Sequence, residues 1–253
     1  MRTVIKLGGR VQSGGDVIAA LAAAWADRGG SLCVVHGGGD DISAVQSRMG
    51  RQSSFMNGRR ITTVEDLEIV RMVLSGSVNK RLVSALVSNA VPAVGVSGED
   101  AGTIIARPID PERFGRAGSV ASVRPRLIET LLSAGYLPVL SPVARDETAD
   151  GGAAMNVNGD DAAAAIAAAL NADLLMVADV EGVMDSSGVA LASLDASMMQ
   201  RMVASSEVSG GMHAKLEAGF AALANGVKSV RIGSMAAIGD ASRGTSLALL
   251  SNQ

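Results

Sequence analysis

Two short stretches decide the fold class: TVIKLGG at residues 3–9 and LCVVHGGG at residues 32–39. Each is an apolar run followed directly by glycines. Apolar runs of four to six residues, without polar alternation, are typical of strands buried on both faces of a sheet. The glycines indicate a turn at the carboxyl end of each strand. We therefore interpret both stretches as strands of one covered sheet.

Similar apolar runs recur along the chain and alternate with helical patterns. Further buried strands are predicted at residues 92–96, 137–140, 174–178 and 229–232. Amphipathic or alanine-rich patterns predict helices around residues 18–25 and at residues 64–89, 161–170 and 212–224. This alternation predicts an α/β fold: a three-layer α/β/α sandwich with a mostly parallel central sheet.

Three regions depart from this alternation. Residues 53–63 contain Asn57-Gly58, a pair typical of a hairpin turn. Residues 100–123 lack helical periodicity and predict short strands or a hairpin layer. The stretch DETADGG at residues 146–152 marks a weak boundary. We expect an N-terminal lobe at residues 1–150 and a C-terminal lobe at residues 151–253.

The composition of the 253-residue chain excludes several functions. Aromatic residues make up 2% and the net charge is −3, which argues against nucleic-acid binding. Charge or glycine interrupts every apolar stretch before about 20 residues, so no membrane span is expected. The N-terminus shows no signal-peptide pattern, and the single cysteine, Cys33, excludes an internal disulfide and predicts a buried thiol. We expect a cytoplasmic protein.

The glycine turns indicate an anion site. Ligands of open α/β sheets bind beyond the carboxyl ends of the strands, where glycine lets backbone N–H groups approach an anion. Residues 8–9 and 37–39 would both lie there, and Asp40 would begin a helix. Tight turns without a ligand are the alternative. The chain has no Walker A motif and no dinucleotide-binding fingerprint in its first turn, which argues against P-loop NTPases and NAD enzymes.

Several charged and amide side chains are candidates for binding. Lys6 is a cation inside an apolar strand, which is costly unless it is paired. Lys215 ends SGGMHAK at residues 209–215, a glycine turn that opens a helix. Either lysine could instead reach solvent.

Two polar clusters and one arginine pair complete the candidates. MNVNGDD at residues 155–161 holds more polar groups than one helix cap needs, and DVEGVMD at residues 179–185 follows a strand. Arg60, beside Arg59, could bind a carboxylate, or the pair could be a solvated turn. The two histidines have neither metal-ligand nor triad spacing, so no metal site on the chain is expected.

Together these motifs resemble the amino-acid kinase family. The resemblance covers nearly the whole chain and rests on eight stretches in the family's order: KLGG (6–9), VHGGG (35–39), NGRRIT (57–62), GSVNK (76–80), GYLPVLS (135–141), NVNGD (156–160), ADVEGV (178–183) and GGMHAK (210–215). It implies transfer of a phosphoryl group from ATP, carrying Mg²⁺, to the side-chain carboxylate of N-acetyl-L-glutamate in arginine biosynthesis. Such a carboxylate is already ionised at neutral pH, so no general base is expected.

The resemblance also implies a role for each motif residue. Lys6 and Lys215 would stabilise the transferring phosphoryl group, Asp160 would organise both lysines, and Arg60 and Asn156 would hold the substrate. The other implied residues are backbone donors in the glycine turns (Gly8, Gly9, Gly38, Gly39) and an ATP site (Asp179, Val180, Glu181, Gly182, Val183, Met184, Val208, Ser209).

The assembly follows from the same resemblance. The N-terminal lobe would bind the acyl amino acid and dimerise through the helix at residues 64–89, and the C-terminal lobe would bind ATP. The chain begins five residues before Lys6, without the N-terminal helix of arginine-inhibited relatives. We therefore expect an arginine-insensitive homodimer.

Two alternatives stay open. The substrate could be another acyl amino acid, such as N-succinylglutamate or carrier-protein-linked α-aminoadipate; the acidic balance of the chain disfavours a carrier. The chain could also be a non-catalytic binding or regulatory module on the same fold. Retention of both lysines together with Asp160 favours an enzyme.

Overall fold

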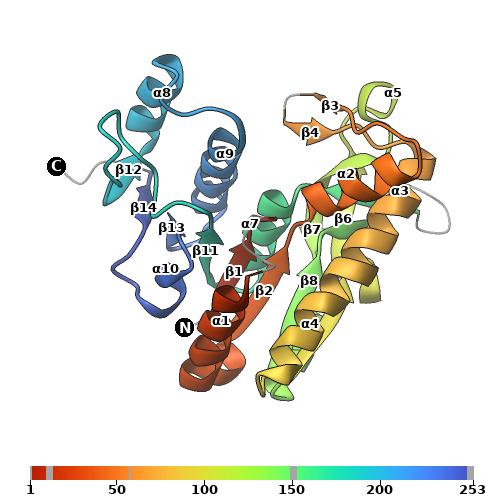
Figure 1. The fold of residues 1–253 in the computed structure, drawn as a ribbon, viewed down its shortest axis with the longest axis horizontal. Helices are drawn as coiled ribbons and strands as arrows, with labels where there is room; N and C mark the ends of the chain where they lie inside the picture. The colour runs from red at the N-terminus through yellow and green to blue at the C-terminus, as the bar shows by residue number, and fades with distance from the viewer. Residues whose placement is uncertain (1, 10–13, 57, 149–152, 250–253) are drawn as a thin grey trace.

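One eight-stranded sheet runs through the computed structural model, which describes residues 2–9, 14–56, 58–148 and 153–249 (Figure 1). Its strands, in spatial order, are β12 (Ser193–Asp195), β14 (Thr245–Ala248), β13 (Val230–Gly233), β11 (Asp173–Val177), β1 (Thr3–Leu7), β2 (Leu32–His36), β8 (Leu137–Ser141) and β5 (Ala93–Ser97). Among these described strands, only the β13–β14 pair is antiparallel. The prediction of a mostly parallel central sheet is confirmed.

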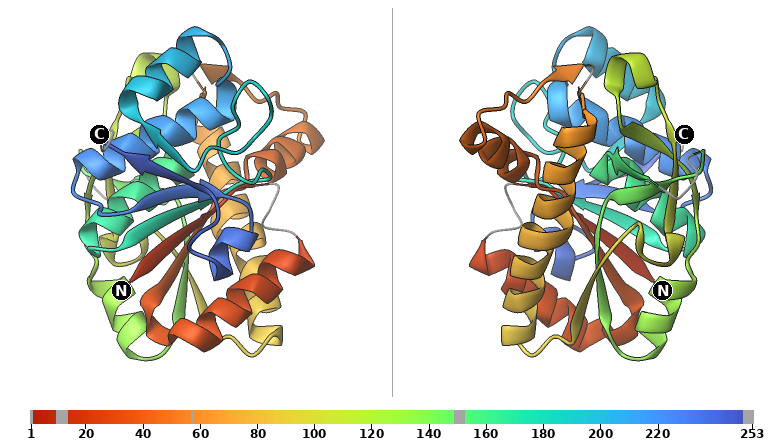
Figure 2. Two further views of the ribbon diagram at one scale, coloured as in Figure 1. Left: turned by 90° about the vertical axis from the view of Figure 1, so that its left-hand side faces the viewer. Right: turned by 90° about the vertical axis from the view of Figure 1, so that its right-hand side faces the viewer.

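Helices cover both faces of this sheet (Figure 2). Because successive strand residues point to opposite faces, Val4 and Met176 belong to one core and Ile5 and Val177 to the other. The first core is closed by α6 (Arg126–Ser133), α7 (Gly159–Ala169), α8 (Ala196–Ala204) and α9 (Gly210–Ala224). The second is closed by α1 (Gly15–Arg28), α4 (Asn79–Ser88) and α10 (Ala236–Gly239). The predicted three-layer sandwich is confirmed, as is the burial of Cys33 in the first core.

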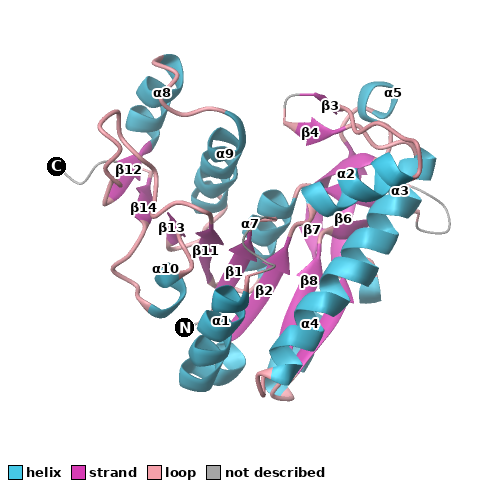
Figure 3. Ribbon diagram, viewed as in Figure 1, coloured by secondary structure: helices cyan, strands magenta, loops and turns pink. Residues whose placement is uncertain are grey.

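A smaller layer stands beyond one end of the sheet (Figure 3). It holds a closed four-stranded barrel of β6 (Ile104–Pro108), β7 (Ala117–Val123), β9 (Val143–Asp146) and β10 (Ala154–Val157), with α5 (Pro111–Phe114) between β6 and β7. Beside it lie α2 (Gly39–Arg48) and the hairpin of β3 (Phe55–Met56) and β4 (Arg59–Arg60). The short strands predicted in residues 100–123 and the hairpin in residues 53–63 are confirmed, although Asn57 lies outside the described residues.

The long helix predicted at residues 64–89 is not uniformly α-helical. It consists of α3 (Val64–Arg71), a π-helical segment (Met72–Val78) and α4. The predicted inner face is buried at Leu67, Val70 and Leu74. Leu74 lies within the π-helical segment, so the predicted inner face is kept there although the segment is not α-helical. Short 3₁₀ turns occupy Gly29–Ser31 and Asp100–Gly102.

The remaining differences concern strand ends and short strands. Several predicted strands are shifted by one residue, and β9, β10, β12 and β14, of three or four residues each, were not predicted. The sheet is continuous across the proposed lobe boundary, because β1 pairs with both β2 and β11. Residues 149–152 of that boundary lie outside the described residues, and the division into lobes stays a prediction. No helix in the described ranges is long and apolar enough to cross a membrane.

Candidate active site

Two pockets lie at the edge of the sheet where β1, β2 and β11 end. The first, here called the hairpin pocket, is lined in part by Gly38, Gly39, Arg60 and Asn156. The second, here called the β11 pocket, is lined by Gly8, Gly9, Gly39, Asp40, Ala178, Asp179, Val180, Gly211, Met212 and Lys215. Gly39 lines both, so the two pockets adjoin at the amino end of α2.

Three charged groups meet between the pockets. Asp160, in the first turn of α7, accepts from Lys6 Nζ at 2.7 Å and from Lys215 Nζ at 3.2 Å. Lys6 comes from β1 and Lys215 from the first turns of α9. Lys6 is 6% exposed and Asp160 also 6% exposed. The fold thus places two ammonium groups around one carboxylate, which leaves an excess of one positive charge.

Burial and mutual interaction shift the ionisation of these groups. Burial lowers the pKa of Lys6 to about 8, since the attraction of Asp160 only partly offsets desolvation and the charge of Lys215 adds to the lowering. Burial alone would raise the pKa of Asp160, but the two ammonium groups outweigh it and hold that pKa below its usual value. Asp160 is therefore ionised at neutral pH and organises both cations.

The glycine turns bring backbone N–H groups to the same place. A Cβ on Gly9 would lie 3.8 Å from the Gly38 nitrogen, so the turns after β1 and β2 lie side by side. Gly38 has φ of 151°, which favours glycine. Helices α2, α7 and α9 all begin at the pockets, with Gly39, Gly159 and Gly211 among the lining residues. Three helix N-termini therefore meet at the pockets, an arrangement that suits an anion, although one N–H of α7 already donates to the Asn158 side chain at 2.7 Å.

The predicted substrate residues both line the hairpin pocket. The Nδ2 of Asn156 donates to Thr62 Oγ1 at 3.0 Å. Arg60 is 7% exposed and its guanidinium lies 4.6 Å from the centre of the Phe55 ring. Its neighbour Arg59 also lines this pocket, but it is only partly buried and pairs with Asp161 of α7 at 2.9 Å. The pocket therefore offers one buried cation and an amide to an anionic ligand.

The predicted ATP residues are divided by the structure. Asp179 and Val180 line the β11 pocket, but the four predicted residues that follow them, Glu181 to Met184, do not. Val183 is fully buried in the core, and a Cβ on Gly182 would lie 2.6 Å from Thr245 Oγ1. These two positions therefore contribute to packing within the protein and do not line the pocket.

The other four residues of the predicted ATP site also have structural contacts. Glu181 is exposed and lies 3.9 Å from Arg243, while Met184 forms a β-bridge with Ala190. Val208 is buried and Ser209 is the N-cap residue of α9. Their roles in nucleotide binding stay a prediction.

Sequence reasoning did not single out several lining residues. Asp40, Gly211 and Met212 line the β11 pocket, and Asn158 and Gly159 line the hairpin pocket. Asp40 directly follows the VHGGG motif, and the other four lie inside the NVNGD and GGMHAK motifs. All five stand at or near the start of a helix, and this position was the signal that could have identified them. Within the described ranges, no group of three or more His, Cys, Asp or Glu side chains could hold a metal ion.

The chain is similar to known proteins in both sequence and structure. The model of the amino acid kinase family matches residues 1–234. The chain belongs to the amino acid kinase family. The acetylglutamate kinases of Geobacillus kaustophilus and Geobacillus stearothermophilus are 40% and 41% identical to this amino acid kinase over 230 residues, which is 88% of either chain in both comparisons. Among solved structures, smu.665 from Streptococcus mutans UA159 is 28% identical with a TM-score of 0.84 and covers 97% of both chains.

Proposed function

We propose that this amino acid kinase transfers the γ-phosphoryl group of ATP to the side-chain carboxylate of N-acetyl-L-glutamate, giving N-acetylglutamyl 5-phosphate for arginine biosynthesis. The observation that carries the proposal is the pair of lysines held by Asp160 between two adjoining pockets. The relatives that are about 40% identical over most of their length bear the name of this activity, which supports the choice of substrate.

In this mechanism the acyl amino acid occupies the hairpin pocket and ATP the β11 pocket. A side-chain carboxylate oxygen attacks the γ-phosphorus, the bond from that phosphorus to the bridging oxygen breaks, and ADP leaves with the electron pair. Lys6 and Lys215 stabilise the negative charge on the phosphoryl oxygens during this step. No proton has to be removed from the attacking carboxylate, so no general base is required.

The other residues bind and orient the two substrates. Arg60 attracts the α-carboxylate and Asn156 holds the acylamino group in the hairpin pocket. The N–H groups of Gly9, Gly38 and Gly39 point to the phosphoryl group. Gly8 borders the nucleotide together with Asp179 and Val180, because its own N–H donates to the Val177 carbonyl at 3.1 Å. Mg²⁺ bound to ATP would offset part of the phosphate charge. We further expect a cytoplasmic homodimer.

Trapping the product with hydroxylamine tests the proposal. Acyl phosphates react with hydroxylamine to give hydroxamates, which can be quantified after incubation with MgATP. We expect turnover with N-acetylglutamate and much less with N-succinylglutamate or α-aminoadipate derivatives. Turnover with only one of the other acids would replace the substrate, and no turnover with any would favour a binding module.

Lys6→Met provides the matching test of the mechanism. Removing one cation that stabilises the transition state should lower kcat by about 10²–10³-fold. The variant should bind N-acetylglutamate with little change in calorimetry, because Lys6 does not line the hairpin pocket. A kcat within about threefold of the wild-type value would contradict the role of Lys6.

A further inference from the structure

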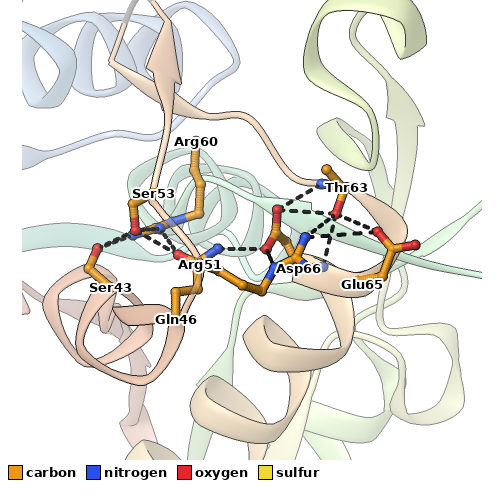
Figure 4. A network of polar contacts seen from close by, with 8 residues as sticks. All are labelled: Ser43, Gln46, Arg51, Ser53, Arg60, Thr63, Glu65 and Asp66. Atoms are coloured by element: carbon orange, nitrogen blue, oxygen red, sulfur yellow. Dashed lines mark hydrogen bonds and ion pairs between the residues drawn. The ribbon is translucent and has the colours of Figure 1, made fainter. Parts of the chain in front are cut away.

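Arg60 is a buried cation that is held entirely by neutral groups. Its Nη1 donates to Gln46 Oε1 at 2.6 Å and to Ser53 Oγ at 2.8 Å. Its Nη2 donates to the Gly39 carbonyl at 2.8 Å and to Ser43 Oγ at 2.9 Å. Figure 4 shows the guanidinium surrounded by these side chains. The guanidinium is fixed in place, yet none of these four acceptors carries a charge.

Gln46 links Arg60 to a carboxylate without bringing that carboxylate into contact. It is 1% exposed, and its Nε2 donates to Asp66 Oδ1 at 2.8 Å while its Oε1 accepts from Arg60. Because the amide is bonded at both ends, its orientation is determined and so is the position of its oxygen.

The charge of Asp66 is already balanced by other groups. Arg51 Nε donates to Asp66 Oδ1 at 2.7 Å, and Thr63 forms a capping box with Asp66 at the start of α3. Although burial opposes ionisation, these hydrogen bonds and that of Gln46 hold the pKa of Asp66 below its usual value. Asp66 is therefore a fixed anion whose direct ion pair is with Arg51. It attracts Arg60 only at longer range, as Asp40 does, so no carboxylate of the described residues contacts the Arg60 guanidinium.

A direct carboxylate partner would have fixed Arg60 equally well but would have neutralised it. A buried cation without an anionic partner is unfavourable, and an anionic ligand relieves that cost when it binds. The ligand-free protein is therefore less stable than it would be with a carboxylate paired to Arg60, and binding of a carboxylate ligand is correspondingly more favourable.

We propose that Gln46 and Asp66 form a positioning relay that fixes the guanidinium of Arg60 while leaving its charge for the α-carboxylate of the substrate. This inference rests on the proposed function and names the device that gives the hairpin pocket its preference for anions.

An exchange variant tests the relay. Gln46→Glu combined with Asp66→Asn keeps the net charge but moves the carboxylate from Asp66 onto Arg60. The charge-assisted hydrogen bonds between Arg60 and the α-carboxylate contribute to the binding free energy of N-acetylglutamate. Neutralising Arg60 weakens them and should raise the Kd and KM for N-acetylglutamate by about 10- to 100-fold. The KM for MgATP should change less than about twofold. Calorimetry without ATP gives the Kd independently of turnover.

Three further variants separate the relay from general effects. Asp66→Asn alone keeps the Gln46 amide on Arg60 and should change the Kd much less than the exchange does. Gln52→Glu makes the same chemical change on an exposed neighbour and should have no effect. Gln46→Met removes the amide at similar volume and replaces the exchange variant as the test if that variant does not fold. It should raise the Kd for N-acetylglutamate at least about fivefold.

The outcomes decide between the two proposals. A folded exchange variant, or a folded Gln46→Met, that binds N-acetylglutamate as tightly as the wild type would overturn the relay. Wild-type protein that neither binds nor phosphorylates N-acetylglutamate would instead overturn the proposed function. In that case the ratio of variant to wild-type Kd, measured with whichever acid the wild type phosphorylates, still tests the relay.

Discussion

Single residues at the ends of β1 and β2 combine deep burial with an ionisable side chain. Lys6 and His36 are 6% and 0% exposed, and each has specific polar partners. Burial disfavours their charged forms, so both titrate well below their usual pKa values. The two shifts have different consequences, because Lys6 carries its charge at neutral pH and His36 does not.

The activity should fall in alkaline solution as Lys6 loses its proton. The pKa of Lys6 is about 8, so Lys6 is cationic below that pH and neutral above it. Since kcat/KM reports groups of the free enzyme, we expect kcat/KM to decline as the pH rises through about 8. Lys6→Arg, whose side chain stays charged, should move the decline to higher pH in whatever activity remains. A pH profile that is flat to about 9.5 would be incompatible with this role of Lys6.

The stability should fall in mild acid because of His36. Its Nδ1 donates to the Gly37 carbonyl at 2.8 Å and its Nε2 accepts from Asn79 at 3.1 Å, so the neutral ring is satisfied. Burial lowers the pKa of His36 to about 4, whereas an unfolded histidine titrates near 6.5. Between these values only the unfolded chain takes up the proton. The free energy of unfolding should therefore decrease as the pH drops from about 6.5 to about 4, by up to about 3 kcal/mol from this residue.

Urea unfolding at pH 7 and pH 5 measures this effect. His36→Gln should reduce the difference between the two pH values. His213, the other histidine, is more exposed and lies 3.7 Å from Glu217, so His213→Gln is the matched control and should leave most of the difference in place. An undiminished difference in His36→Gln would show that another group is responsible.

At the scale of elements, β5 and α4 are in unusually close contact. A Cβ on Gly95 of β5 would lie 1.8 Å from Asn79 Oδ1 and 2.9 Å from Lys80 Nζ. Asn79 is 1% exposed and donates to the Val139 carbonyl as well as to His36, so it has little freedom to move. The absence of a side chain at Gly95 therefore allows α4 to pack on the sheet.

Gly95→Ala should consequently destabilise the protein. Overpacking of this kind costs about 1–3 kcal/mol, which thermal or urea unfolding followed by circular dichroism would detect. Gly239→Ala, at the end of α10, is the control, because a Cβ there meets no atom within 4 Å among the described residues. Equal stability of the Gly95 and Gly239 variants would disprove the close contact.

The whole molecule exposes apolar side chains along the helical segment from Val64 to Ser88. Val64, Met72 and Val87 are 61%, 55% and 54% exposed. The homodimer expected from the sequence stays a prediction, and we expect its interface to include this segment.

Light scattering should give a mass of twice the 25.5 kDa of the chain. Met72→Lys should shift the mass toward the monomer, because it would bury a charge in the interface. Val189, which is 62% exposed on a loop after β11, gives the control Val189→Lys with no expected effect. A monomeric wild type at micromolar concentration would contradict the homodimer, and an unchanged Met72→Lys dimer would place its interface elsewhere.

Local sequence patterns were enough to predict six strands of the central sheet, its burial on both faces and the glycine turns. These depend on local apolar runs and on glycine, which act over a few residues. The order of the motifs also singled out Lys6, Asp160 and Lys215. Local patterns do not encode which strands become neighbours, so the π-helical segment, the short strands and the barrel were not foreseen in detail.

The grouping of the candidate residues into one site depends on contacts between distant parts of the chain. The meeting of Lys6, Asp160 and Lys215 depends on the place of β1 between β2 and β11, a pairing set by residues far apart in the chain. Long-range packing also buries Val183, a predicted ATP-site residue, in the core. It also gave Gln46, an unremarkable helix residue in the sequence, its bonds to Arg60 and Asp66. The orientation of a side chain and its hydrogen-bond partners depend on contacts between segments far apart in the sequence, so local sequence patterns do not predict them.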